Sequence, residues 1–530
     1  MSIYTIGVII SIIAYIIIGN YAGKSVKDVD DYYVSGRNAP TILITGTLFA
    51  SMLSTNGFMG DTAWTYTGHI TAMIMINALC AAGYIFGPLF FGRYIRRAEA
   101  ITMPQYFGDR FNSKRVQRLA GITTIISMTA YLLAVLQGTS LLMEELTGMS
   151  TFMCLFISWI CFTSFTFYSG SSGVILTDTV MFVIFIGATV IAGPFIFGEA
   201  GGLSNLVTNL MASPDNPQNL LAYHGNLDGG TIFDSMSYMI TIGLVWLVTV
   251  AVSPWQASRN LMAKNEHVTF RAGTISAICT TLFLTFLYLM AISLILINPN
   301  IEPTETVMIW ASFNVMPKII GVFVLTGIMA AGLSSASTFL SVAGFSLSND
   351  VYDFKFKTDK KQLWFSRWVM LGISLVSLIL AYYNPPAIRI ISWFASTIIA
   401  ASWGPVAFAS VWSKKVTEKG AYWGMLLGFA GMLAAQAVNN LTSISLTGVF
   451  HPFFIGIYLN LIGIYFGTKT STVSKEEQSY LEKLHIIPDS EVNPKDYKRD
   501  RMYGTILIAS GVLVSVLLII FWVIPYNGGI

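Results

Sequence analysis

The chain contains few charged residues. Asp, Glu, Lys and Arg together make up 11% of its 530 residues, whereas 54% are hydrophobic. A soluble protein would carry roughly a quarter charged residues, so the composition excludes an ordinary soluble protein. Apolar runs long enough to cross a bilayer recur from end to end. The sequence therefore predicts a polytopic protein embedded in a lipid bilayer.

The sequence also lacks the usual signatures of catalysis. Its four cysteines, Cys80, Cys154, Cys161 and Cys279, all fall in apolar runs, and no pair has metal-ligand spacing. There is no recognisable nucleophile–base pair, metal cluster or phosphate-binding loop. We therefore predict that the protein is not an enzyme.

The predicted fold class is all-α, with about fourteen transmembrane helices. The predicted spans lie at about residues 3–21, 42–65, 70–94, 119–142, 150–168, 173–198, 236–258, 271–296, 319–348, 365–384, 388–412, 420–438, 449–468 and 503–524.

Basic residues are almost absent from every second connection between these spans. If both termini face outward, all of the 30 Lys and Arg residues except Lys318 and Arg389 fall in the six inward connections. Basic residues concentrate on the cytoplasmic side of membrane proteins. The sequence thus predicts a multi-pass protein of the plasma membrane with both termini outward. The net charge of +3 reflects this orientation and not nucleic-acid binding.

Two predicted spans are interrupted at related places. Gly57 lies within span 42–65, and Pro254 lies near the end of span 236–258. If each begins a five-span repeat, the odd number of spans gives the two repeats opposite orientations. Discontinuous first helices in inverted repeats indicate a binding site near the bilayer midplane.

This pattern divides the chain into five parts. We expect an extra N-terminal helix and inward loop (1–40), a first inverted repeat (41–200), an outward loop (201–235), a second inverted repeat (236–412) and three C-terminal helices with an inward charged loop at 469–502 (413–530).

A row of hydroxyl side chains lies within span 319–348. Ser334, Ser337, Thr338 and Ser341 are spaced i, i+3, i+4 and i+7, so on a helix they share one face. Oxygen ligands of this kind can coordinate a hard cation. Ser and Thr also line close helix–helix contacts in membranes, and the spacing alone leaves both interpretations open.

Asp178 is the most informative single residue. A carboxylate inside a span is costly unless it is paired or solvated. No Lys or Arg lies in a neighbouring apolar segment, so a bound cation is the expected partner. A protonated acid that is hydrogen-bonded to nearby hydroxyls is the alternative.

Several motifs occur in an order that resembles the sodium:solute symporter family, which includes sodium/proline, sodium/galactose and sodium/sialic acid transporters. They are Thr177-Asp178-Thr179 behind a glycine-rich start, the run Ala330 to Thr338, Asn349-Asp350-Val351-Tyr352, and Gly404-Pro405 with Trp412. The resemblance covers about residues 30 to 430. It implies a leucine-transporter-type core of two inverted five-helix repeats.

The resemblance also implies two sodium sites. The first would use backbone carbonyls of Ala50, Leu53 and Ala331 with the hydroxyls of Ser334 and Ser335. The second would use Asp178, Ser334, Ser337 and Thr338. All four of these positions carry oxygen side chains here, so we predict two coupled Na⁺ ions.

Candidates for the solute site are Ser54, Gly57, Asp61, Asn77, Gln137 and Trp255. Asp61 is expected to face the outer vestibule, where it would meet a substrate amino group or act as a gate; it could instead be a helix-end acid at the outer interface. Asn77 and Gln137 could instead join helices. Trp255 is expected to be an inner-gate residue or an interfacial anchor.

Together these features predict a sodium-coupled symporter that imports a small organic solute by alternating access. An amino acid or small carboxylate is favoured. Asp61 suits an amine, and span 119–142 contains no arginine for the carboxylate clamp of the sialic acid branch. Trp412 after Gly404-Pro405 resembles the proline, pantothenate and monocarboxylate branches more than the sugar branch. The alternatives are a proton-coupled carrier with Asp178 as the proton site, and a transporter-like sensor or channel.

Overall fold

The structure is a computed structural model that describes residues 2–23, 29–213, 221, 231–352, 358–384 and 387–528. Over these ranges the regular elements are all helices and no strand is formed. Ten of the helices are long and apolar enough to cross a membrane. The all-α prediction is confirmed. Each predicted span falls on a helix, but the count of fourteen crossings is not confirmed.

The first part of the chain forms α1 (Ile3–Gly23) and α2 (Val29–Val34), followed by a long helical segment. That segment consists of α3 (Thr41–Thr55), η2 (Asn56–Asp61), α4 (Thr62–Trp64), η3 (Thr65–His69), α5 (Ile70–Gly87), η4 (Pro88–Gly92) and α6 (Arg93–Ala98). Then come α7 (Met103–Arg110), α8 (Lys114–Thr147), α9 (Thr151–Glu199) and α10 (Leu206–Ala212). Residues 214–220 and 222–230 of the predicted outward loop lie outside the described residues.

The second part begins with α11 (Ile232–Val252), α12 (Pro254–Met262) and α13 (Glu266–Ser293). It continues with α14 (Val307–Asn314), α15 (Lys318–Phe345), η8 (Ser346–Val351), α16 (Asp359–Tyr383) and α17 (Ile388–Trp412). The last helices are α18 (Glu418–Leu441), α19 (Pro452–Lys469), α20 (Lys475–His485), α21 (Pro494–Leu518), η11 (Ile519–Val523) and α22 (Ile524–Gly528).

Both predicted interruptions are present. The backbone of α3 leaves helical geometry at Ser54 (φ 15°, ψ −179°). The second break is at Ser253 (φ −63°, ψ 150°), between α11 and α12, and Pro254 occupies the first turn of α12, where its missing N–H costs nothing. Each break interrupts the regular ladder of backbone hydrogen bonds, so backbone groups there can face a ligand.

Small residues allow the central helices to approach closely. A Cβ atom on Gly332 of α15 would lie 2.4 Å from Thr139 of α8, and one on Gly138 would lie 2.7 Å from Thr55 of α3. On α3, a Cβ on Gly46 would lie 2.6 Å from Thr179 of α9. Glycine at such contacts is typical of membrane helix packing. The broken helix α3 is therefore held against α8, α9 and α15.

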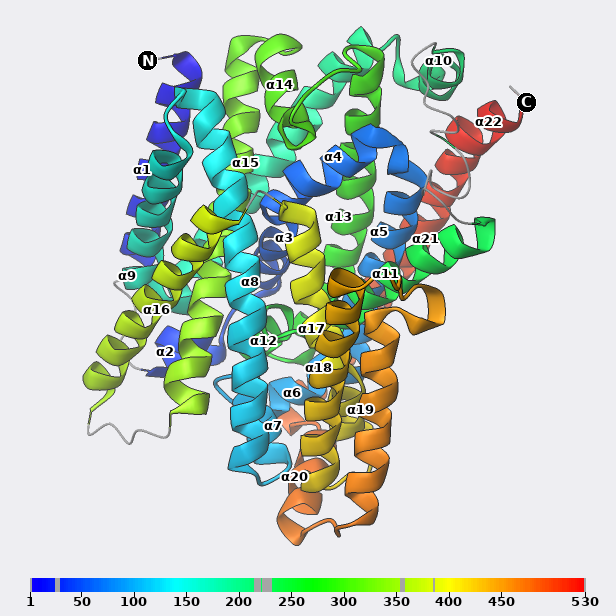
Figure 1. The fold of residues 1–530 in the computed structure, drawn as a ribbon. Helices are drawn as coiled ribbons and strands as arrows, with labels where there is room; N and C mark the ends of the chain where they lie inside the picture. The colour runs from blue at the N-terminus through cyan, green and yellow to red at the C-terminus, as the bar shows by residue number, and fades with distance from the viewer. Residues whose placement is uncertain are drawn as a thin grey trace.

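The two termini lie at the same end of the molecule, near α10 and α14, whereas α7 and α20 lie at the opposite end (Figure 1). The segment before α3 meets the segment after α12: the Ala39 N–H donates to the Met262 carbonyl at 3.1 Å, and the Lys264 N–H donates to the Ala39 carbonyl at 3.1 Å. This bridge joins the segment before the first predicted repeat to the connection that follows the first, broken helix of the second.

Candidate sodium and solute sites

Asp178 is fully buried and brings α9 together with α3 and α15. Its Oδ2 atom accepts a hydrogen bond from the Thr47 hydroxyl at 2.6 Å, and its Oδ1 atom accepts one from the Ser334 hydroxyl at 2.6 Å. The predicted association of Asp178 with Ser334 is therefore present. Both partners are hydroxyls, so they orient the carboxylate without neutralising it.

The expectation that Asp178 has no basic neighbour is wrong. The Nη2 atom of Arg259, on α12, lies 3.7 Å from Asp178 Oδ2, and both side chains are buried. The same Nη2 donates a hydrogen bond of 2.6 Å to the Thr338 hydroxyl. We placed Arg259 in an inward connection because it follows an apolar span. Beyond the break at Ser253, however, α12 turns this residue into the packed interior.

The other predicted ligands of the second sodium site differ in their contacts. Thr338 contacts the Arg259 guanidinium, while the Ser337 hydroxyl donates to the Ser334 carbonyl of its own helix at 2.8 Å. Asp178, Ser334 and Thr338 thus surround one region that holds a cationic side chain. Ser337 is one turn along the same face of α15.

The predicted first sodium site lies where α15 meets the break in α3. The Ser335 hydroxyl donates to the Ser51 carbonyl at 3.4 Å. Ala50, Leu53 and Ala331 are buried, as are Ser334 and Ser335. Backbone carbonyls and hydroxyls are oxygen ligands suited to a hard cation. Within the described residues no group of three or more His, Cys, Asp or Glu is placed to hold a metal ion, so carbonyls and hydroxyls are the available donors.

A small cavity with about 30 Å³ of free volume lies beside the same break. In this conformation it has room for water but not for a solute, so a solute would require a more open state of the same site. Four residues predicted from the sequence line it: Leu53, Gly57, Asp61 and Asn77. The remaining lining residues are Met52, Asn56, Met73, Ile76, Cys80, Trp246, Leu284, Tyr288 and Trp393.

Asp61 is the acidic residue of this cavity, with only 8% of its surface exposed. Its Oδ1 atom accepts a hydrogen bond of 3.0 Å from the Asn56 amide, and the Tyr288 hydroxyl donates to Oδ2 at 3.5 Å. The side chain is therefore buried against the cavity and does not lie at an outer helix end in the interface.

The cavity also holds polar atoms without a partner. Among the described residues, Asn56 Oδ1, Asn77 Oδ1 and the Trp393 indole nitrogen are buried and make no hydrogen bond. Buried polar groups are almost always hydrogen-bonded, so a ligand or water is expected to complete them. Asn77 also donates weakly to α13, to the Thr281 carbonyl at 3.5 Å, so it contributes both to the cavity and to helix contact.

An aromatic layer covers one side of the cavity. Trp393 packs edge-on against Trp64, with ring centroids 5.4 Å apart. The guanidinium of Arg389 lies over both rings, 4.5 Å from the centroid of Trp64 and 4.7 Å from that of Trp393. These distances are typical of cation–π contacts. Little in the sequence distinguishes these tryptophans, because 13% of the chain is aromatic.

Three predicted solute residues do not line the cavity. The Ser54 hydroxyl accepts a hydrogen bond from the Asn56 N–H at 3.1 Å, so it stabilises the break itself. Gln137 of α8 donates to the Asn384 carbonyl at 3.2 Å and accepts from the Ala387 N–H at 3.2 Å, which fits the helix-joining interpretation. Trp255 is 1% exposed, so it is not an interfacial anchor.

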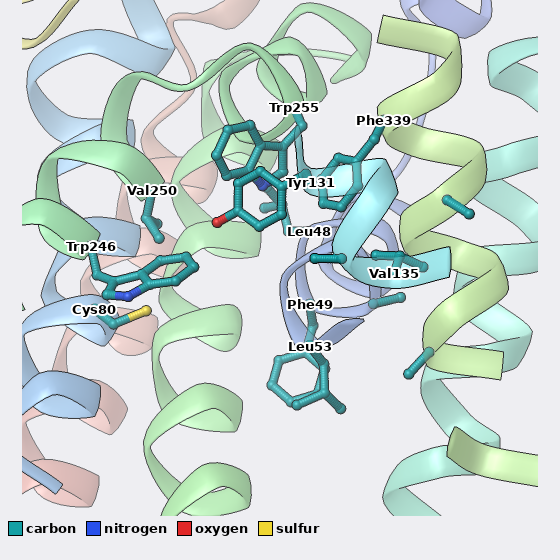
Figure 2. Close-up of a cluster of buried hydrophobic side chains, with 14 of the residues drawn as sticks. Leu48, Phe49, Leu53, Cys80, Tyr131, Val135, Trp246, Val250, Trp255 and Phe339 are labelled. Atoms are coloured by element: carbon teal, nitrogen blue, oxygen red, sulfur yellow. The ribbon is translucent and has the colours of Figure 1, made fainter. Parts of the chain in front are cut away.

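Trp255 instead belongs to an aromatic cluster with Tyr131 and Phe339. The Tyr131 ring centroid lies 5.0 Å from that of Trp255 and 4.7 Å from that of Phe339. Figure 2 shows these three rings close together, with Trp246 and Cys80, which line the cavity, to one side. The cluster joins α8, α12 and α15.

Comparison with known proteins agrees with this architecture. A model of the sodium:solute symporter family matches residues 32–428. The chain is 25% identical over 442 residues to the high-affinity proline transporter PutP of Bacillus subtilis (strain 168), covering 79% of this chain and 89% of that protein. It is 24% identical over 440 residues to the sodium/proline symporter of Escherichia coli (strain K12), covering 79% and 84%.

A solved structure of a Na⁺-coupled sialic acid symporter in a substrate-bound, outward-open state has a TM-score of 0.76 to this chain. The two are 18% identical, and the match covers 90% of this chain and 99% of the other. At this identity the likeness establishes the fold. The family match covers most of the chain, including both broken helices and the hydroxyl row of α15. The chain therefore belongs to the sodium:solute symporter family and is a sodium-coupled membrane transporter, not an enzyme.

Proposed function

We propose that the protein imports a small amine-bearing solute, with an amino acid as the best fit, together with two sodium ions. The observation that carries the proposal is the excess of hydrogen-bond acceptors in the cavity beside the break in α3. The Asp61 carboxylate and the unpartnered carbonyl oxygens of Asn56 and Asn77 all belong to this cavity. An ammonium group has three N–H donors and no acceptor, so it complements such a site.

The aromatic walls add to this preference. Trp246, Tyr288 and Trp393 line the same cavity, and aromatic faces attract cations. The Trp393 indole N–H is the unpartnered donor there, and Arg389 packs on the same ring. A carboxylate would fit on this side. In a more open state of the site, a zwitterion with its ammonium toward Asp61 and its carboxylate toward Trp393 and Arg389 would satisfy both ends.

The two ions would occupy the sites predicted from the sequence. The first would lie among the carbonyls of Ala50, Leu53 and Ala331 and the hydroxyls of Ser334 and Ser335. The second would lie at Asp178 with Ser334, Ser337 and Thr338. Ser334 belongs to both sets, so it links the two ions. Each ion that moves down a membrane potential contributes about 2.3 kcal/mol per 100 mV. A neutral zwitterion gains no free energy from the potential itself, so the ions must supply the free energy for its accumulation.

Alternating access would then follow from the fold. Sodium orders the break in α3, solute completes the cavity, and the cluster of Trp255, Tyr131 and Phe339 opens toward the inside. In this arrangement fourteen helices cross the plasma membrane and both termini face outward. The outward side is the end of the molecule that carries α10 and α14 in Figure 1.

Thermal stabilisation of the purified protein tests the proposal. We expect an amino acid to raise the melting temperature in sodium but not in potassium, and Asp61→Asn to remove this shift. Glu302→Gln, which removes an exposed acid outside the cavity, is the matched control. A ligand that is equally effective in potassium would contradict sodium coupling, and a shift that survives in Asp61→Asn would contradict the amine-binding role.

A further inference from the structure

Arg259 is a buried cation at the place predicted for a sodium ion. Its side chain is 3% exposed and that of Asp178 is fully buried. Its Nη2 atom contacts Asp178 Oδ2 at 3.7 Å and Thr338 Oγ1 at 2.6 Å. Two of the four ligands predicted for the second sodium ion are therefore already in contact with a positive charge.

Sodium and the guanidinium cannot both use these oxygens. A sodium ion needs several oxygen ligands at short distance, and a second cation a few ångströms away repels it strongly in the interior of the protein. The alternative, a site with neither cation, leaves a carboxylate buried without a countercharge, which is also costly. One cation at a time is the arrangement that the local charges favour.

We propose that Arg259 is a tethered cation that occupies the second sodium site in the sodium-free protein and is displaced when sodium binds there. The proposal rests on the two-sodium symport proposed above. It gives the empty carrier a neutral site: after sodium leaves to the inside, the guanidinium pairs with Asp178 while the carrier returns.

A small pocket adjoins Arg259 and Thr338. It has about 30 Å³ of free volume, and its lining includes Thr102, Ser341 and Ser346. Displacement of the guanidinium would therefore require this region to open. The Ser341 hydroxyl is buried and makes no hydrogen bond within the described part of the chain. Once this region opens, Ser341 would be one acceptor for the displaced guanidinium, which must also move far enough from Asp178 to weaken its repulsion of the sodium ion.

The exchange would couple ion binding to the closure of the inner side. Asp178 lies on α9 of the first predicted repeat, whereas Arg259 and Thr338 lie on α12 and α15 of the second. Trp255 of the aromatic cluster is one helical turn before Arg259 on α12. When sodium replaces the guanidinium, α12 loses its charged contact with α9, and the aromatic cluster can move with it.

The test is a sodium titration of the purified full-length protein at constant ionic strength, with potassium as the replacement ion and no solute. Thermal stabilisation reports the binding. The sodium-dependent rise in melting temperature that is lost in Asp178→Asn is assigned to the second site. We expect Arg259→Gln to lower the half-saturating sodium concentration of that part about tenfold, because the internal competitor is gone.

Two further variants make the result specific. Arg259→Lys keeps the charge and should give a half-saturating concentration closer to that of the unmodified protein. Arg118→Gln removes an exposed arginine of α8 and should leave the titration unchanged. If Arg259→Gln does not fold, the Arg259→Lys titration against the unmodified protein carries the test, because a shorter ammonium loses the contact to Thr338 and should lower the half-saturating concentration by a smaller factor.

The outcomes separate this proposal from the one on which it rests. A sodium-specific response with the same half-saturating concentration in Arg259→Gln would overturn the exchange and leave symport intact. A higher concentration would also overturn it, because Arg259 would then help to hold the ion. Absence of any sodium-specific response in every variant would overturn both proposals.

Discussion

Arg271 and Asp500 join the start of α13 to the C-terminal part of the chain. The Arg271 Nε atom lies 2.6 Å from Asp500 Oδ1, and Nη2 lies 2.7 Å from Asp496 Oδ1. Asp500 Oδ2 is also 2.6 Å from His267 Nδ1. Asp496 and Asp500 lie in the first two turns of α21, at the end of the charged segment 469–502. Their contacts tie this segment to the N-terminal part of α13.

The first prediction concerns this contact. Asp500→Asn leaves the buried Arg271 guanidinium with one fewer carboxylate and breaks the contact to His267. A hydrogen bond to a charged group contributes about 1.5–3 kcal/mol, so the melting temperature should fall measurably. Asp489→Asn, which changes an exposed acid in the same region, should have no effect. Equal melting temperatures for both variants would show that the contact does not stabilise the fold.

The second prediction concerns Ser334, which the two proposed sodium sites share. Its hydroxyl donates to Asp178, so Ser334→Ala removes both a ligand and the group that orients the carboxylate. We expect the half-saturating sodium concentration to rise about tenfold or more. Ser312→Ala is the control, because that buried hydroxyl donates only to the Met308 carbonyl of its own helix. A normal sodium titration in Ser334→Ala would remove Ser334 from both sites.

The third prediction concerns the aromatic cluster. Trp255→Ala removes a buried ring that packs against both Tyr131 and Phe339, which typically costs about 3–5 kcal/mol in stability. If the cluster closes the inner path, solute should also leak across proteoliposomes without sodium. Trp255→Phe should retain most of the seal, and Trp368→Ala should not leak, because Trp368 is 59% exposed. If Trp255→Ala is destabilised but proteoliposomes that contain it do not leak solute, Trp255 packs the core without acting as a gate.

The fourth prediction concerns the packing of α18 on α19. A Cβ atom on Gly463 would lie 2.5 Å from the Trp423 carbonyl, whereas one on Gly511 of α21 would meet nothing within 4 Å. Gly463→Ala should therefore destabilise the protein by about 1–3 kcal/mol through overpacking. Gly511→Ala should be neutral or stabilising by up to about 1 kcal/mol, because alanine favours the helix. The measurement is the melting temperature of both variants and the unmodified protein in the same detergent. An unchanged melting temperature for Gly463→Ala would refute the close contact between α18 and α19.

Features that depend on neighbouring residues along the chain could be predicted before the fold was known. Hydropathy over about twenty residues marks a helix that can lie in a membrane, whatever surrounds it. The breaks at Ser54 and Ser253 follow from local backbone chemistry next to Gly57 and Pro254. The hydroxyl row on α15 follows from helical periodicity, and the ordered motifs were enough to indicate the family.

Which distant side chains meet became apparent from the packing of the helices. Arg259 was assigned to an inward connection by its position after a span, yet the α12 segment buries it beside Asp178. Asp61 meets Asn56 through a local contact, but Tyr288, Trp246 and Trp393 reach the same cavity from three other helices. The sequence shows that Gln137 is polar and that Trp255 is aromatic. Packing then places Gln137 in a contact between helices and Trp255 in an aromatic cluster. The physical reason is that a buried charge is stabilised or destabilised by whatever the fold brings within a few ångströms of it, and spacing along the chain does not contain that information.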